Sequence, residues 1–235
     1  MMKQELLYEG KAKRIYKTEQ EHVLWVAYKD SATAFNGQKQ AEIIGKAQLN
    51  NKISSFLFSM LHEQGIETHF IQSLSDSEQL VKQVNIIPLE VVVRNMTAGS
   101  LAKRIGVQEG IPFATPIVEL YYKNDELGDP LIIDEHAIFL EAATAQEISL
   151  LKAQALRIND VLKQFFKEKG IQLVDFKLEF GKTASGELIL ADEISPDTCR
   201  FWDIETNEKL DKDVFRRDLG TLTEAYEKIL ERIGG

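Results

Sequence analysis

A row of charged side chains stands out in the segment LVDFKLEFG. If this segment is a β-strand, alternate side chains share a face, so Asp175, Lys177 and Glu179 point the same way at steps of about 7 Å. The downstream segment ELILADE ends in Asp192 and Glu193, and the intervening KTASG predicts a β-hairpin. The hairpin is expected to bring Asp175, Glu179 and Asp192 into one neighbourhood. Clustered carboxylates repel each other unless a cation lies between them, and oxygen ligands suit Mg²⁺.

The same alternation has a simpler interpretation. Val174, Phe176, Leu178 and Phe180 would form the buried face of a half-buried strand, and the charged row would be its solvated face. The hairpin partner favours the functional interpretation, because it adds carboxylates at the same end of the strand.

A second polar face occurs in PLEVVVRN, where Glu90, Val92 and Arg94 share one side of a predicted strand. A valine-rich strand is normally buried on both sides, so Arg94 is expected to face a cleft; the alternative is an arginine that reaches water at the strand end. Gly99 and Ser100 then enter a predicted short helix, whose first backbone N–H groups can bind an anion.

The third candidate is YEGKAKRIY near the start of the chain. Gly10 lies in a predicted turn between two strands and is followed by Lys11 and Lys13. Protein kinases fold such a glycine-bearing turn over the phosphates of ATP. The alternative is a charged hairpin tip, and the sequence has neither G-x-x-x-x-G-K-[ST] nor G-x-G-x-x-G.

Other chemistries are disfavoured. The chain contains no H-E-x-x-H, C-x-x-C or G-x-S-x-G motif. The four histidines are scattered, and His62 and His69 are predicted to be surface residues. Cys199 has no evident base nearby in the sequence, which favours a small site-lining residue over a nucleophile.

The composition limits the classes of function. The 235 residues are 44% hydrophobic and carry a net charge of −9, which disfavours nucleic acid as a partner. No apolar run approaches the roughly 20 residues of a membrane span, and the first residues lack the apolar core of a signal peptide. With a single cysteine no intramolecular disulfide can form. A cytoplasmic protein is therefore expected.

These side chains need a mixed framework of strands and helices to position them. ELLYE, KRIYKT and HVLWVAYK predict three strands, and apolar residues at helical spacing predict a helix over 41–64 that ends at Gly65. A strand near THFIQ, a polar stretch SDSEQ and the strand IPLEVVVRN are expected next. A capping box of Thr144 and Glu147 predicts a long helix that stops at Gly170, and a last helix is predicted over 216–232.

Strands precede helices, which favours an α+β fold with two lobes. Residues 1–84 are expected to form a β-rich lobe that covers the nucleotide, and residues 85–235 an α+β lobe that carries the metal and substrate residues.

Six of these segments occur together in a recognisable order. They are YEGKAKRIY, DSATAFNG, PLEVVVRNMTAGS, KNDELGDP, LVDFKLEFG and LADEISPDTCRFWD. In this order and spacing the chain resembles the SAICAR synthetase (phosphoribosylaminoimidazole-succinocarboxamide synthase) family over residues 8–226. The resemblance implies a two-lobed α+β fold whose ATP lobe is similar to those of protein kinases and ATP-grasp ligases.

The resemblance also implies an activity. Members join 5-amino-1-(5-phosphoribosyl)imidazole-4-carboxylate (CAIR) to L-aspartate in de novo purine (IMP) biosynthesis, giving SAICAR, ADP and phosphate through an acyl phosphate. ATP and Mg²⁺ are implied as cofactors, and a homodimer is an expectation because family members are often dimeric. Two other hypotheses are a small-molecule kinase and a non-catalytic nucleotide-binding module. The intact set Lys13, Glu179, Asp192 and Arg200 disfavours the last.

The resemblance assigns roles to individual residues. ATP contacts are implied at Gly10, Lys11, Ala12, Lys13, Ile15, Lys82 and Ile86, with residues 82–88 as the hinge that holds adenine. Mg²⁺ ligands are implied at Glu179 and Asp192. Substrate contacts are implied at Arg94, Ser100, Lys123, Asp129, Asp197 and Arg200. Catalytic roles are implied for Lys13, Asp175, Lys177 and Arg200, and Trp202 is expected to pack beneath the site.

The segment DSATAFNG departs from some relatives, which have Asp where this chain has Asn36. A role that depends on charge at this position is therefore not expected. Residues 31–38 lie between a predicted strand and a predicted helix. Two interpretations stay open: a lid that closes over the site when substrates bind, and an ordinary surface connection.

Overall fold

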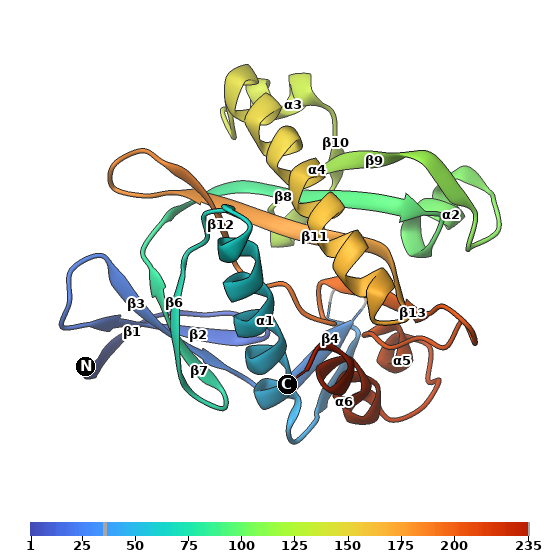
Figure 1. The fold of residues 1–235 in the computed structure, drawn as a ribbon. Helices are drawn as coiled ribbons and strands as arrows, with labels where there is room; N and C mark the ends of the chain where they lie inside the picture. Colours follow the sequence, from blue (N-terminus) through green and yellow to red (C-terminus); the bar gives the residue numbers. More distant parts are fainter. Residues whose placement is uncertain (35–36, 235) are drawn as a thin grey trace.

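The structure is a computed structural model that describes residues 1–34 and 37–234 (Figure 1). Within these residues the strands form a five-stranded sheet, a six-stranded sheet and a two-stranded hairpin. The helix α4 lies across one face of the six-stranded sheet, and the five-stranded sheet lies beyond α1, toward the N-terminus (Figure 1). The predicted α+β class is confirmed.

The five-stranded sheet contains only residues from the first third of the chain. Its strands follow the order β1 (Lys3–Glu9), β2 (Lys13–Thr18), β3 (Val23–Tyr28), β7 (Glu78–Lys82) and β6 (Phe70–Ser75). The three strands predicted first and the one near THFIQ are confirmed. Strand β7 was not predicted, because its first residues were assigned to a polar stretch; Leu80 and Val81 are in fact buried.

The six-stranded sheet carries most of the candidate site. Its order is β10 (Leu131–Ile132), β9 (Pro112–Tyr122), β8 (Asn85–Met96), β11 (Ile171–Lys182) and β12 (Leu188–Ala191), with β13 (Cys199–Asp203) also paired to β11. The hairpin of β11 and β12 is confirmed, and it places Glu179 opposite Ala191, next to Asp192. Strand β9 was not predicted.

A β-bulge changes the alternation predicted for β11. The pairing of β11 with β13 shifts between Leu173 and Asp175. Leu173 and Phe176 therefore both enter the main hydrophobic core, whereas Val174 packs separately with Ala98 and Trp202. The prediction that Val174 shares a face with Phe176 is wrong, because the bulge inserts one extra residue between them.

The helix predicted over 41–64 begins later than expected. Residues Lys39–Glu42 form β5 and pair with β4 (Ser31–Ala34), and α1 spans Lys46–Glu63. Gly45 has a φ of 91° and separates strand from helix, which leaves Ile44 87% exposed. The segment 31–38, a lid in one interpretation, is therefore in part a strand, and its residues 35 and 36, Asn36 included, lie outside the described residues.

The later helices follow the prediction in part. The capping box of Thr144 and Glu147 is confirmed at the start of α4 (Ala145–Glu168). The short helix α2 (Gly99–Ile105) is confirmed, while α3 (Asp134–Phe139) and the 3-10 turn η1 (Asp125–Leu127) were not predicted. The last helix is confirmed as α6 (Leu222–Ile233), but it begins later than predicted. A separate short helix, α5 (Asp213–Arg216), precedes it, and Asp218 and Gly220, with φ values of 55° and 157°, lie between the two.

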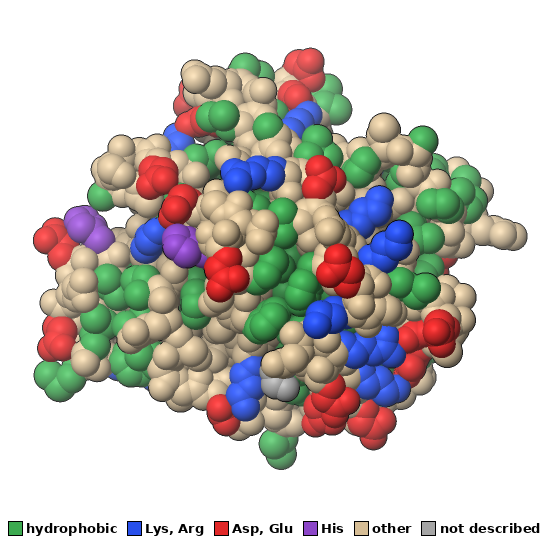
Figure 2. All heavy atoms as spheres, in the orientation of Figure 1, with side chains coloured by type: hydrophobic (Ala, Val, Ile, Leu, Met, Phe, Trp, Pro, Cys, Tyr) green, Lys and Arg blue, Asp and Glu red, His purple; other side chains and the backbone are tan. Residues whose placement is uncertain are grey.

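The main core lies between the six-stranded sheet and the helices α1 and α4. It contains, among others, Leu57 of α1, Val91 of β8, Leu178 of β11 and Ile158 of α4, all without exposed surface. On the face shown in Figure 2, acidic and basic side chains are interspersed, without a broad basic surface of the kind that binds nucleic acid. No helix in the described part of the chain is long and apolar enough to cross a membrane.

Candidate active site

Two adjoining cavities are lined by residues of the six-stranded sheet, and one of them is also lined by residues of the five-stranded sheet. The larger has a volume of about 690 Å³ and the smaller about 360 Å³. The side chains that line both cavities are Glu90, Asp129, Lys177, Asp197 and Thr198. Two ligands bound side by side could therefore meet at these residues.

The apolar end of the larger cavity has the character of a nucleotide-base slot. It is lined by Ile15 of β2, Leu24 and Val26 of β3, Val81 of β7, and Val84 and Ile86 of the predicted hinge at 82–88. Gly181 permits this shape, because a Cβ there would lie 2.6 Å from the Val84 side chain. Such a narrow apolar slot suits a planar ring. Gly10, Lys11, Ala12 and Lys82, all predicted ATP contacts, also line this cavity.

The other end of the larger cavity is charged. Lys13 forms an ion pair with Asp192 and lies 3.1 Å from Glu193 Oε1. Burial disfavours its charge, but the Asp192 and Glu193 carboxylates raise the pKa of Lys13 above its ordinary value. Burial would raise the pKa of Asp192, but Lys13 and Lys177 lower it below its usual range. Lys13 and Asp192 therefore both stay charged. The backbone of Asp192 is strained, with a φ of 59°.

Lys177 lies at the junction of the two cavities. Its Nζ is 2.5 Å from Glu179 Oε1, 3.1 Å from Glu90 Oε1 and 3.4 Å from Asp192 Oδ2. Burial opposes the ammonium charge, but the surrounding carboxylates raise the pKa of Lys177 well above its ordinary value. Glu179 is also paired with Lys123. Lys177 is thus a permanent cation and cannot serve as a base.

The carboxylates of Glu179 and Asp192 could hold a divalent metal. Both contact the same Lys177 ammonium, so they face one point in the cavity. Among the described residues no three His, Cys, Asp or Glu side chains form a metal cage. Two carboxylates completed by phosphate oxygens and water are nevertheless a donor set typical of Mg²⁺. The residues present therefore fit the predicted ion.

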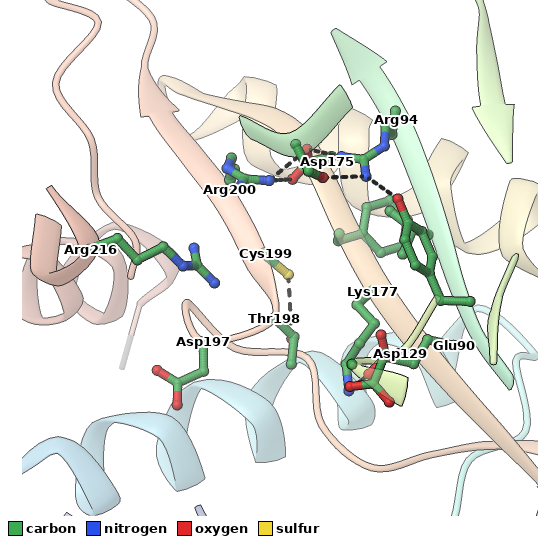
Figure 3. Close-up of a pocket in the computed structure, with 15 residues that line it drawn as sticks. Glu90, Arg94, Asp129, Asp175, Lys177, Asp197, Thr198, Cys199, Arg200 and Arg216 are labelled. Atoms are coloured by element: carbon green, nitrogen blue, oxygen red, sulfur yellow. Dashed lines mark hydrogen bonds and ion pairs between the residues drawn. The ribbon is translucent and has the colours of Figure 1, made fainter. Parts of the chain in front are cut away.

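Asp175 does not join this cluster, and the prediction that it would is wrong. It lines only the smaller cavity, where Arg94 Nη1 lies 2.8 Å and Arg200 Nη1 2.9 Å from its Oδ2 (Figure 3). Asp175 is therefore the common partner of Arg94, which is buried, and of Arg200, which is half-buried. The reason is distance along β11: Asp175 pairs with Arg94 on β8, whereas Glu179 pairs with Ala191 on β12.

Further carboxylates orient the two arginines. Arg94 Nε lies 2.6 Å from Glu119 on β9, and Arg200 Nε lies 3.0 Å from Asp213 on α5. Ser100 Oγ lies at the limit of hydrogen bonding, 3.5 Å from Arg94 Nη2. Sequence reasoning missed Glu119 and Asp213. A signal for Glu119 exists in ATPIVELYY, which alternates like a strand.

Gly99 allows Arg200 to lie against the start of α2. A Cβ at this position would be 2.3 Å from Arg200 Nη2, and the glycine has a φ of 52°. Its N–H donates to Glu109 Oε1 at 2.7 Å. Of the amino acids, only glycine lacks the Cβ that would clash with Arg200 and also adopts this positive φ without strain.

Asp197 lines both cavities, but its carboxylate contacts other parts of the protein. Its oxygens accept hydrogen bonds from Lys46 Nζ at 2.6 Å and from Tyr226 Oη at 2.5 Å. Lys46 and Tyr226 have no exposed surface. Figure 3 shows the Asp197 carboxylate turned away from the Asp175 arginine cluster. The loop between β12 and β13 is thereby fixed to α1 and α6.

Two residues set aside earlier also line the cavities. Cys199 is buried in the smaller one, and burial raises the pKa of its thiol, as suits a lining residue. His69 lines the larger one and is 6% exposed, so its predicted surface position is wrong. The polar sequence around it concealed that β12 covers it: Leu190 accepts a hydrogen bond from its backbone N–H. Burial lowers the pKa of His69 to about 3, which keeps it neutral.

Lys11, a further predicted ATP contact, is exposed, and its Nζ lies 2.7 Å from Asp125 Oδ1. Trp202 is buried and packs with Ala98 and Val174. The larger cavity has an apolar slot that leads to lysines and to two carboxylates that could bind a metal, and this arrangement suits a nucleoside triphosphate. The smaller cavity contains two arginines and suits a small anion. Fold and site together define an α+β enzyme that uses a nucleotide to act on an anionic substrate.

Comparisons with known proteins agree. The sequence profile of the SAICAR synthetase family matches residues 6–233. The phosphoribosylaminoimidazole-succinocarboxamide synthases of Bacillus cytotoxicus and Anoxybacillus flavithermus are 66% and 64% identical over 100% of this chain and 98% of their own. A crystal structure of the Ehrlichia chaffeensis synthase has 50% identity and a TM-score of 0.95, covering 97% of this chain and 98% of that one.

A further solved structure, a SAICAR synthetase in complex with ADP, has 52% identity and a TM-score of 0.94, with 97% of each chain covered. The chain belongs to the SAICAR synthetase family. It is an ATP-dependent ligase of purine biosynthesis that joins CAIR to L-aspartate.

Proposed function

We propose that ATP occupies the larger cavity and CAIR the smaller one, and that the CAIR carboxylate is phosphorylated at their junction. The observation that carries the proposal is the sharing of Lys177 and its neighbours by both cavities. The adenine would enter the apolar slot at Ile15 and Ile86, beneath the turn at Gly10. The ADP complex of a relative supports a nucleotide site in this fold.

The phosphates of ATP would extend toward Lys13 and Lys11. Glu179 and Asp192 would hold Mg²⁺, which when bound neutralises charge on the phosphates. Lys177 stays protonated beside both carboxylates, so it can steady the acceptor carboxylate and the moving phosphoryl group. The CAIR phosphate would contact Arg94, Arg200 and Ser100, because an arginine fork can bond two phosphate oxygens at once.

The protein's part in the chemistry is then positioning and charge neutralisation. A carboxylate oxygen is a poor leaving group, and phosphorylation converts it into a good one. The L-aspartate amine attacks the carboxyl carbon, the carbon–oxygen bond to the phosphoryl group breaks, and inorganic phosphate leaves. Lys123, Asp129 and Asp197 lie along the cavities where this second step would occur.

A crossed pair of variants tests the assignment of the two cavities. Arg94→Lys keeps the charge and loses the fork, so CAIR binding should weaken about 10- to 100-fold while ATP binding stays within twofold. Ile86→Glu places a charge in the apolar slot at a residue that is 42% exposed, and it should weaken ATP binding only. Calorimetric titration of each ligand measures both. An equal effect of Arg94→Lys on ATP would contradict the assignment.

We also propose the wider arrangement implied by the family likeness. Residues 1–84 would act as the lobe that covers ATP and residues 85–235 as the lobe that carries the metal and substrate residues. Support comes from the five-stranded sheet, which lies wholly before residue 85. A cytoplasmic location follows from the substrates of the pathway. A homodimer rests on the family likeness, and sedimentation at several concentrations tests it.

A further inference from the structure

Asp129 is the exception among the carboxylates that line the two cavities. Those carboxylates are Glu90, Asp125, Asp129, Asp175, Glu179, Asp192, Glu193 and Asp197. In the described part of the chain each of them forms an ion pair with a lysine or arginine, except Asp129. Asp129 also lines both cavities, on the same side as Glu90 and Lys177 in Figure 3.

The backbone, instead of a cation, holds Asp129 in place. Its Oδ1 accepts a hydrogen bond from the Asn124 N–H at 2.9 Å, and its own N–H donates to the Asn124 carbonyl at 3.1 Å. The residue has a φ of 50°, a conformation that costs free energy and persists where the surroundings enforce it. The loop therefore presents a carboxylate whose second oxygen has no protein cation to neutralise it.

We infer that Asp129 receives the ammonium group of L-aspartate and takes a proton from it. The inference rests on the proposed function, because it places the amine at the junction where the CAIR carboxylate becomes phosphorylated. L-aspartate brings one ammonium group, which needs an anionic partner inside a site rich in lysine and arginine. The other carboxylates at the junction are occupied: Glu90 by Lys177, and Asp197 by Lys46 and Tyr226.

The proton balance requires such an acceptor. The ammonium gives one proton to the Asp129 carboxylate, and the amine so formed has the lone pair that attacks the carboxyl carbon. The nitrogen–carbon bond forms as the carbon–oxygen bond to the phosphoryl group breaks, and the second nitrogen proton leaves with inorganic phosphate.

The test compares two nucleophiles in Asp129→Asn. Asparagine tolerates a positive φ and its oxygen can keep the bond from Asn124, so the variant removes the charge and leaves the loop intact. Hydroxylamine is uncharged at neutral pH, so it needs no anionic partner and can trap an acyl phosphate as a hydroxamate. The matched control is Glu126→Gln, an exposed residue of the same loop outside both cavities.

With ATP and CAIR present, Asp129→Asn should lower kcat/KM for L-aspartate by about 100-fold or more and keep hydroxamate formation within about twofold of wild type. Glu126→Gln should change neither rate. Unchanged use of L-aspartate by Asp129→Asn would overturn the inference, as would an equal loss with both nucleophiles. If wild-type enzyme formed no hydroxamate, the acyl phosphate of the proposed function would fail, while the L-aspartate rate would still test Asp129.

Discussion

Replacement of Gly99 by alanine should damage the smaller cavity, which is the proposed CAIR site, and leave the larger cavity, the proposed ATP site, intact. The new Cβ would lie 2.3 Å from Arg200 Nη2 and 2.7 Å from its Cζ. Carbon atoms in contact are about 3.5–4.0 Å apart, so the guanidinium must move by about 1 Å or more. Its bonds of 2.9 Å to Asp175 and 3.0 Å to Asp213 would then lengthen beyond hydrogen-bond range.

The expected losses can be estimated. One charge-assisted hydrogen-bond pair contributes about 1.5–3 kcal/mol, which corresponds to a decrease in kcat/KM for CAIR of about 10- to 150-fold. Alanine in the left-handed region costs about 1–2 kcal/mol of stability, or a decrease in Tm of about 2–8 °C for a chain of this size. Steady-state kinetics with CAIR and ATP varied in turn, and a thermal melt, measure both.

Gly186→Ala is the matched control. Gly186 lies at the tip of the β11–β12 hairpin with a φ of 86°, and no atom lies within 4 Å of an added Cβ. It should lower the Tm by a similar amount and leave the KM for CAIR unchanged. Wild-type use of CAIR by Gly99→Ala would refute the reasoning, and so would the same kinetic defect in Gly186→Ala.

Two further substitutions test the charges of the site and its surroundings. Asp192→Asn keeps the size of the side chain and should lower kcat by at least about 100-fold with a native circular dichroism spectrum; wild-type activity at saturating Mg²⁺ would remove Asp192 from the proposed metal ligands. Asp211 is fully buried, and burial with the neighbouring Asp213 raises its pKa to about 7. Because the folded pKa exceeds the ordinary value of 3.8, this group stabilises the fold at low pH, and that contribution is lost as the pH rises toward 7. Asp211→Asn should therefore make the Tm less dependent on pH between about 4 and 7, and an unchanged pH profile would contradict the raised pKa.

The sequence predicted those features that depend on neighbouring residues. The capping box of α4, the β11–β12 hairpin and the short helix at Gly99 all follow from local patterns, and the structure confirms them. The six ordered segments were enough to identify the family, and five of them supply residues that line the two cavities.

Features that depend on distant contacts could not be predicted. Asp197 accepts bonds from Lys46 and Tyr226, which are 151 and 29 positions away, so no local pattern shows that its carboxylate is occupied. The contact of Arg94 with Glu119 could not be predicted either, because Glu119 lies on β9, a strand that was not predicted. The bulge on β11 arises from its pairing with β13 and not from its own alternation.

The transfer of the phosphoryl group to the CAIR carboxylate is the central claim, and oxygen labelling tests it directly. If the carboxylate is phosphorylated before L-aspartate attacks, one of its oxygens must leave with the phosphate. CAIR labelled with ¹⁸O in that carboxylate should pass one labelled oxygen to inorganic phosphate in each turnover, measured by mass spectrometry. Unlabelled phosphate, with SAICAR still formed and no exchange of the label with water, would contradict the account.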